Sequence, residues 1–119
     1  MRTHDWVREL FTAIDAGDAT GFGEFLADDA AFRFGNAEPV HGKTAIVDAV
    51  KGFFGSIKSV HHEIEESWFT DGAVIVHGTA TYTSHDGGSI TVPFCNVFKM
   101  SGDRIREYLI YVDVSGLYV

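Results

Sequence analysis

With 119 residues, the chain has room for one sizeable hydrophobic core and hardly for two, so we expect a single domain over 1–119. Hydrophobic residues make up 45% of it, ten Phe among them, which excludes a disordered chain. Nine basic residues against seventeen acidic ones give a net charge of −8, which disfavours nucleic acids and anionic membranes as partners.

The first half of the chain is predicted to be helical. Apolar residues recur at helical spacing from Trp6 to Ile14, with Thr3 as the N-cap and Gly17 as the stop. Asp18 can begin a shorter second helix, which two glycines weaken. A short strand over residues 30–34 and a third amphipathic helix ending near Gly55 follow.

From Ile57 onward, apolar and polar residues alternate, which predicts strands. Tight-turn signals at residues 71–72, 86–88 and 101–103 separate four such strands, so we expect an antiparallel meander that curves around the helices. Pro93 cannot donate to a strand ladder, so its strand needs a bulge or a free edge there. The order of elements is that of an α+β fold.

Several kinds of site are disfavoured by the sequence. Cys95 is the only cysteine, which excludes an intramolecular disulfide and a cysteine-based zinc site. The run His61-His62-Glu63 does not predict a metal site, because adjacent strand residues point to opposite faces. Charges interrupt the first residues, and no stretch is long enough to span a bilayer. We expect a cytoplasmic protein without a metal or another cofactor.

Polar residues on apolar strand faces are the candidates for function, because a buried polar group costs free energy unless it is paired. Asn96 is the clearest candidate, since it alternates with five apolar residues between Ile90 and Met100. It would hydrogen-bond a ligand in a cavity, or its amide would satisfy backbone groups at a bulge near Pro93. Both alternatives stay open.

Asp113 is the second candidate, between Val112 and Val114 at the end of the last strand. A desolvated carboxylate there would have a raised pKa and would act as acid or base near neutral pH. The alternative is a strand-end Asp that accepts backbone hydrogen bonds. His62 is a third candidate for proton transfer, on an apolar face shared with Trp68, although such a His is commonly a packing residue.

Three segments in order resemble the NTF2-like (SnoaL-like) family over nearly the whole chain. Residues 16–32 resemble its helix-two region, residues 38–43 the lead into its third helix, and residues 93–113 its last hairpin. The resemblance implies a cone, in which three N-terminal helices pack on a strongly curved, mainly antiparallel sheet around an apolar pocket. It also implies a homodimer formed through the outer sheet faces.

The chemistry of two known branches does not transfer intact. The oxyanion-hole Asp of ketosteroid isomerases falls on Asn96, whereas their two other catalytic roles fall on apolar residues. The Arg and Asp that limonene-epoxide hydrolases keep on one strand fall on Gly78 and Ala80, which leaves only Asp113 in place of their last-strand Asp. Fold alone therefore does not name the reaction.

We expect a protein that binds a small apolar molecule and performs acid/base isomerisation, cyclisation or hydration on a carbonyl-type substrate. Asp113 is expected as the acid or base, and Asn96 is expected to orient the substrate oxygen. Further ligand contacts are expected from side chains of the predicted pocket wall: Tyr111, His62, Phe34, Leu109, Phe94, Phe98 and Trp68. The alternative is a non-catalytic ligand-binding or dimerisation module of the same family.

Overall fold

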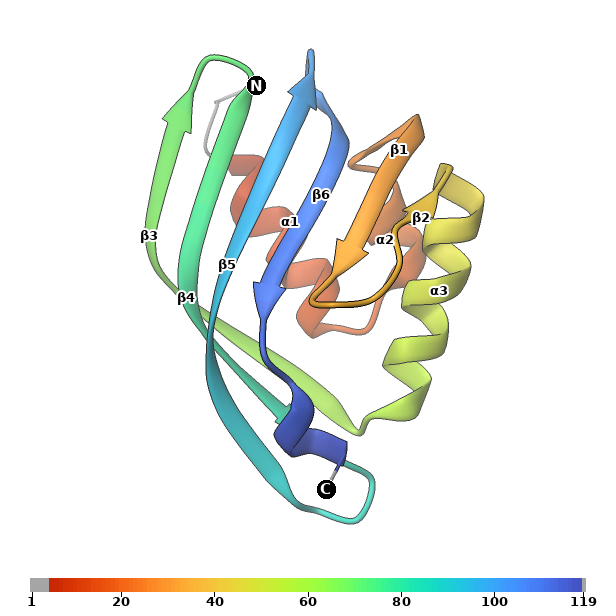
Figure 1. The fold of residues 1–119 in the computed structure, drawn as a ribbon, viewed down its shortest axis with the longest axis vertical. Coiled ribbons are helices and arrows are strands. Elements are labelled where there is room, and N and C mark those ends of the chain that lie inside the picture. Colours follow the sequence, from red (N-terminus) through yellow and green to blue (C-terminus); the bar gives the residue numbers. More distant parts are fainter. Residues whose placement is uncertain (1–4, 119) are drawn as a thin grey trace.

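The computed structural model describes residues 5–118, in which three helices pack against one face of a curved six-stranded sheet (Figure 1). The helices are α1 (Asp5–Asp15), α2 (Ala19–Gly23) and α3 (Lys43–Ser56). The strands are β1 (Leu26–Phe34), β2 (Val40–His41), β3 (Ser59–Thr70), β4 (Ala73–Thr83), β5 (Ser89–Ser101) and β6 (Arg104–Val112), and a 3-10 turn, η1 (Ser115–Tyr118), follows. Within this range, no helix is both long and apolar enough to cross a bilayer. The predicted α+β class is confirmed.

Helix α1 forms as its periodicity predicts. One apolar face is buried, made of Trp6, Val7, Leu10, Phe11 and Ile14. The predicted N-cap, Thr3, lies outside the described residues. Gly17 adopts a φ of 70°, and its N–H donates to the carbonyl of Ile14 at 2.9 Å, so the helix is closed by a left-handed residue. The last helical residue is Asp15, whose carboxylate lies beside the sheet.

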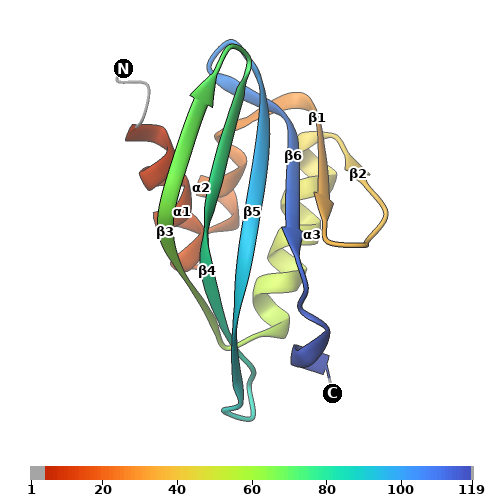
Figure 2. The ribbon, with the colours of Figure 1, turned by 60° about the vertical axis from the view of Figure 1, so that its left-hand side comes forward.

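The sheet is mixed but mainly antiparallel, in the order β2-β1-β6-β5-β4-β3 (Figures 1 and 2). The predicted meander of four antiparallel strands is confirmed as β3 to β6. Strand β1 adds to it in parallel beside β6, and the short β2 pairs with β1. Pro93 pairs with Thr79 on β4 but lies just beyond the stretch of β5 that β6 covers, so its missing N–H faces a free side.

Within the meander, two bulges change which side chains of β3 and β6 face the helices. Glu65 is an extra residue in β3, between the pairs that Ile64 and Glu66 make with β4. Arg106 is an extra residue in β6, opposite the step from Lys99 to Met100. An extra residue reverses the alternation of side chains beyond it. The pairing of β5 with β4 has no such shift, so the inner face of β5 keeps its predicted register.

Gly78 lies on β4 where the bulged part of β3 passes closest. A Cβ atom at this position would collide with the backbone carbonyl oxygen of Glu63. Because backbone atoms cannot yield as a flexible side chain does, we expect Gly78→Ala to lower the free energy of unfolding by about 1–3 kcal/mol.

Chemical denaturation measures that loss, and Gly52→Ala is the matched control. Gly52 lies in α3 with open space where its Cβ would be, so its replacement should raise stability by about 0.5–1 kcal/mol through helix propensity. Equal effects of the two substitutions would contradict the close approach at Gly78.

Aromatic side chains fill the layer between sheet and helices. Phe98 is fully buried, with its ring centroid 4.6 Å from that of Tyr108 and 5.5 Å from that of Trp6. Further along the inner face of β5, Asn96 and Phe94 border a cavity. The core therefore supports one wall of the pocket.

Candidate functional site

A cavity of about 210 Å³ lies between the inner face of the sheet and the helices α2 and α3. Its lining is largely aromatic and aliphatic: Ile14, Phe22, Phe32, Phe34, Ala37, Glu38, Val40, Ala49, Val50, Phe53, Phe54, Val60, His62, Tyr82, Phe94, Asn96, Tyr108 and Ile110. The exposed residues Ala37 and Glu38 border it, so it opens to solvent beside the connection from β1 to β2. Such an apolar cavity with a few polar groups is the usual form of a small-molecule site.

Apart from tyrosines, Asn96 is the only buried residue with a polar side chain in the described part of the chain, with 2% of its surface exposed. It faces inward because β5 alternates without interruption between Phe94 and Phe98. Its neighbours across the ladder are Val76 on β4 and Ile110 on β6, which offer no side-chain hydrogen bond. The side-chain oxygen of Asn96 has no hydrogen-bond partner in the structure. The predicted inward position of this residue is confirmed.

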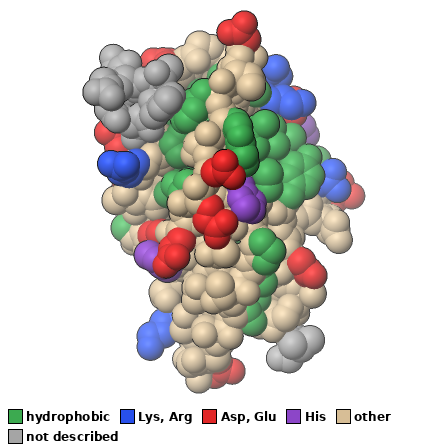
Figure 3. Space-filling view, turned by 90° about the vertical axis from the view of Figure 1, so that its left-hand side faces the viewer, with side chains coloured by type: hydrophobic (Ala, Val, Ile, Leu, Met, Phe, Trp, Pro, Cys, Tyr) green, Lys and Arg blue, Asp and Glu red, His purple; other side chains and the backbone are tan. Residues whose placement is uncertain are grey.

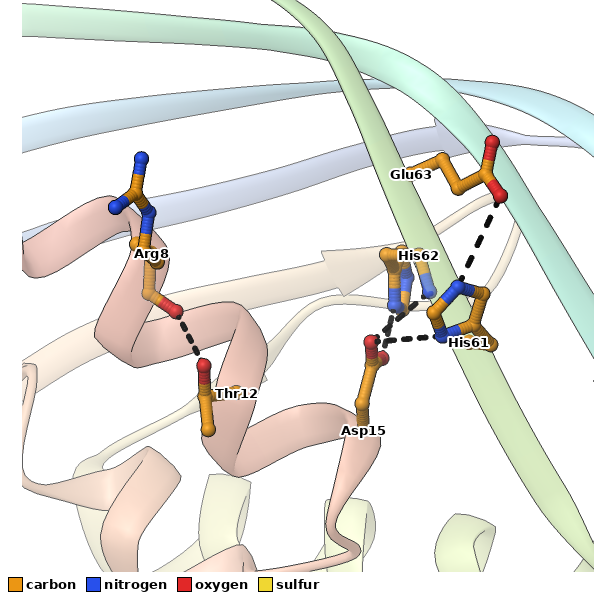
Figure 4. A network of polar contacts seen from close by, with 6 residues as sticks. All are labelled: Arg8, Thr12, Asp15, His61, His62 and Glu63. Carbon is orange, nitrogen blue, oxygen red and sulfur yellow. Dashed lines mark hydrogen bonds and ion pairs between the residues drawn. The ribbon is translucent and has the colours of Figure 1, made fainter.

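His62 and Asp15 form a hydrogen-bonded pair at the pocket wall (Figure 4). The Nδ1 atom of His62 lies 2.6 Å from Oδ1 of Asp15, and the backbone N–H of His62 donates to Oδ2 at 3.0 Å. Both carboxylate oxygens are thus engaged by one residue. The two side chains are 9% and 24% exposed, so the pair is shielded from most of the solvent.

Two aromatic rings hold the imidazole of His62 in place. Phe11 lies 5.0 Å away between ring centroids and Phe94 lies 5.1 Å away, edge to face. Phe11 and Asp15 are one helical turn apart on α1 and therefore project to the same side of the helix. One helix face and one strand thus fix both the position and the orientation of His62.

The contact with Asp15 determines which ring nitrogen of His62 carries the hydrogen and which keeps a lone pair. A carboxylate accepts a hydrogen bond, so the neutral imidazole carries its hydrogen on Nδ1 and donates it to Asp15. Nε2 then keeps a lone pair and can accept a proton from a bound molecule. The same carboxylate would stabilise the imidazolium that results.

His61 approaches the same carboxylate from outside the pocket. Its Nδ1 lies 3.7 Å from Oδ2 of Asp15 and its Nε2 lies 3.9 Å from Glu63, with 68% of the His61 side chain exposed (Figure 4). Both histidines reach Asp15 because β3 is the edge strand and α1 ends beside that edge. Among residues 5–118, no group of three or more His, Cys, Asp or Glu side chains is arranged to hold a metal ion.

The comparisons with known proteins agree with this architecture. Residues 7–108 match the family described as the SnoaL-like domain. The chain belongs to this family. A relative, the sordarin/hypoxysordarin biosynthesis cluster protein G of Sordaria araneosa, is 26% identical over 115 residues, which cover 91% of this chain and 78% of the relative.

Solved structures show that this SnoaL-like domain has an NTF2-like, ketosteroid-isomerase-like fold. An NTF2-like protein of unknown function from Burkholderia pseudomallei K96243 superposes with a TM-score of 0.86 at 20% identity, covering 95% of this chain and 92% of its own. TerC, co-crystallized with polyporic acid, superposes with a TM-score of 0.82 at 15% identity, covering 96% and 93%. At these identities the likeness shows the fold.

The SnoaL-like domain brings four of the predicted site residues to the pocket: Asn96, His62, Phe34 and Phe94. Phe98 is buried but packs on Trp6 and Tyr108 and does not border the cavity. Residues that sequence reasoning did not select also line the wall, above all the rings of α3 and the buried Tyr108. Burial raises the pKa of the Tyr108 hydroxyl, which keeps it neutral and able to donate a hydrogen bond.

Three residues predicted to line the pocket face away from it: Trp68, Leu109 and Tyr111. The inward position predicted for Trp68 is wrong, because the bulge at Glu65 turns it outward, and it is 44% exposed. Leu109 and Tyr111 alternate with the pocket residues of β6 and so lie on the outer face, where Tyr111 is 59% exposed.

The apolar surroundings predicted for Asp113 are also wrong. Asp113 follows the last residue of β6, and its carboxylate is exposed. Oδ1 accepts the backbone N–H of Ser115 at 3.0 Å at the start of η1. This hydrogen bond holds the pKa of the Asp113 carboxyl below its usual value, the opposite of the predicted direction. The structure thus corresponds to the alternative of a strand-end Asp that accepts backbone hydrogen bonds.

Asp15 is a further site residue that sequence reasoning missed. It lies 47 residues from His62 along the chain and belongs to a helix, whereas the polar candidates predicted from the sequence lie on strand faces. One signal is present in the sequence: an acidic residue at the C-terminal end of a helix meets the negative end of the helix dipole, which is unfavourable without a partner. His62 supplies that partner.

Proposed function

We propose that this SnoaL-like domain binds a small, mostly apolar ring compound and moves a proton on it, in an isomerisation, cyclisation or hydration of a carbonyl-type substrate. The observation that carries the proposal is the 2.6 Å contact between His62 and Asp15 at the wall of an apolar cavity. A histidine oriented by a carboxylate, with its other nitrogen toward a bound molecule, is the usual arrangement of a general base.

In this proposal, Nε2 of His62 accepts the proton from a carbon next to the substrate carbonyl. The electrons of that C–H bond form a carbon–carbon double bond, the π electrons of the carbonyl move onto its oxygen, and the product is an enolate. The imidazolium then returns the proton at a different atom, which completes the isomerisation or prepares a ring closure. Asp15 is the positioning residue that stabilises the imidazolium, and Asn96 orients the substrate oxygen.

The cavity limits the size of the substrate. At about 210 Å³ it is somewhat larger than the roughly 150 Å³ apolar cavity that accommodates benzene. Its walls of Phe rings suit a flat apolar skeleton of one or two rings. The relatives support a role in small-molecule metabolism: one is a biosynthesis-cluster protein, and TerC was crystallized with polyporic acid.

A thermal-shift screen tests the binding part of the proposal. The panel holds one- and two-ring ketones, quinones, epoxides and fatty acids. At a hundredfold excess over Kd, a ligand should add about 2.7 kcal/mol to the stability of the folded state. We expect compact ring compounds to give this shift and long fatty acids to give none.

A matched pair of variants on α3 locates the binding. Both Ala49 and Ala45, one turn earlier, are exposed, but only Ala49 borders the cavity. Ala49→Trp should abolish the shift and Ala45→Trp should preserve it. A shift that survives in Ala49→Trp would place the binding elsewhere and contradict the proposal.

One observation favours a second candidate, a non-catalytic ligand-binding or dimerisation module. Asp15 accepts the backbone N–H of His62 on the edge strand, which is also how a purely structural carboxylate would close a sheet edge. Under this reading the pair stabilises the fold and ligands bind without turnover. The effect of Asp15 substitution on turnover, compared with its effect on stability, separates the two.

We also propose that the protein is a cytoplasmic homodimer formed through the outer sheet face. A row of apolar residues crosses four strands there, in the register Trp68, Ile75, Val97 and Leu109, with Tyr111 beside it. Figure 3 shows hydrophobic side chains gathered toward the right of the view, with acidic and imidazole groups next to them. Exposed apolar groups gathered in this way are typical of an interface.

Sedimentation velocity tests this assembly. We expect a dimer for the wild type and a monomer for the double substitution Trp68→Glu and Tyr111→Glu, because buried charges at the interface would be unpaired. Lys51→Glu on the exposed side of α3 is the control and should leave the dimer intact. A monomeric wild type would contradict the proposed interface.

A further inference from the structure

The unpaired side-chain oxygen of Asn96 indicates which chemical group a ligand would present to it. A buried hydrogen-bond acceptor without a donor lowers the stability of the folded protein. Such a group is expected mainly where it has another role, such as binding a ligand. Asn96 is 2% exposed, borders the cavity, and has its Oδ1 atom without a partner. An acceptor that the protein leaves unpaired at a pocket wall is available to a donor on the molecule that fills the pocket.

The surroundings of Asn96 leave that donor to the ligand. Its neighbours along and across the strands are Phe94, Phe98, Val76 and Ile110, whose side chains cannot donate a hydrogen bond. The Nδ1 atom of His62 is engaged by Asp15, and the hydroxyl of Tyr108, which borders the same cavity, makes no hydrogen bond to the Asn96 oxygen.

We propose that the natural ligand carries a hydroxyl group, phenolic or enolic, on a skeleton of one or two rings, and that this O–H donates to Oδ1 of Asn96. The inference rests on the proposed function in that it places the ligand in the same pocket. It adds the chemical class: a hydroxylated ring compound, in place of one whose only oxygen is a carbonyl or an ether. Discrimination arises because an ether or ketone would leave the Asn96 oxygen unpaired on binding.

Isothermal titration calorimetry with three probes of similar size tests the inference. The probes are 2-naphthol, 2-methoxynaphthalene and 2-tetralone, which present a donor, a capped oxygen and a carbonyl. We expect 2-naphthol to bind wild-type protein about tenfold more tightly than either of the others, as one hydrogen bond allows. In Asn96→Leu the three affinities should converge. Thr91→Val, on the opposite face of the same strand, should keep the preference.

Three results would overturn the inference. Equal affinities for naphthol and its methyl ether in the wild type would show that no acceptor is in use. Tighter binding of the ketone than of naphthol would show that the N–H₂ group of Asn96, which orients the substrate carbonyl oxygen, makes the contact and that Oδ1 is not used. A naphthol preference that persists in Asn96→Leu would assign the contact to another residue.

The same titration on His62→Gln separates this inference from the proposed function. The hydroxyl preference should persist there, because the acceptor is on β5 and not on the dyad. If His62→Gln keeps full turnover while the preference for naphthol is intact, the proton-transfer role fails and the hydroxyl inference stands. If turnover is lost but no preference exists in the wild type, the reverse holds.

Discussion

Replacing His62 with Gln should lower the rate of proton transfer on a bound ketone by about 10²–10⁴-fold, the usual contribution of a positioned general base. Gln keeps a polar side chain of similar reach but cannot take up a proton. The measurement is the exchange of the α-hydrogens of 2-tetralone in D₂O, followed by ¹H NMR and corrected for the exchange without protein.

Asp15→Asn should cause a loss of about a hundredfold or more in the same assay. An amide at this position can donate to Nδ1 of His62, which would force the hydrogen onto Nε2 and remove the lone pair that accepts the proton. His41→Gln is the control, because His41 is exposed on β2 and does not border the cavity. Rates within about threefold of wild type in both dyad variants would exclude a role for the dyad in proton transfer.

Asn96→Leu should make the protein more stable while it weakens ligand binding. The substitution removes a buried acceptor without a partner and replaces it with an apolar group in apolar surroundings, so we expect a gain of about 1–2 kcal/mol in the free energy of unfolding. Differential scanning calorimetry should show a Tm higher by several degrees.

A decrease in the Tm of Asn96→Leu would assign Asn96 a different role. If Asn96→Leu lowers the Tm, the amide is satisfied by the protein itself, and its role is structural. Thr91→Val is the matched control on the outer face of β5, where the hydroxyl of Thr91 pairs with that of Thr81 at 2.9 Å. Thr91→Val leaves only the exposed hydroxyl of Thr81 without its partner. The free energy of unfolding should therefore change by less than about 0.5 kcal/mol.

The fold followed from the sequence because its local signals agree with one another. Helical spacing from Trp6 to Ile14 and alternation in β5 each specify one buried face, and the structure buries those faces. The position of Asn96 could be predicted because no bulge interrupts β5 in its pairing with β4. Where apolar and polar residues alternate along a strand without a bulge, the side chains that face inward can be predicted from the sequence.

The wrong predictions for Trp68 and Asp113 arise at a bulge and at the end of a strand. The extra residue Glu65 turns Trp68 to the outer face, and the alternation of apolar and polar residues does not reveal this bulge. Asp113 lies beyond the last residue of β6, where solvent and a backbone N–H determine its state. The pairing of Asp15 with His62 joins residues far apart in sequence, so only the packing of α1 against the edge strand reveals it.

The tautomer of His62 tests the central claim most directly and requires no knowledge of the natural substrate. Long-range ¹H–¹⁵N correlation spectra of protein labelled with ¹⁵N-histidine report which ring nitrogen carries the hydrogen. At a pH where the imidazole is neutral, we predict the hydrogen on Nδ1, toward Asp15, and a shift of the Nε2 resonance when 2-tetralone is added. A hydrogen on Nε2, or an Nε2 resonance that a bound ketone leaves unchanged, would contradict a dyad poised to accept a proton in the pocket.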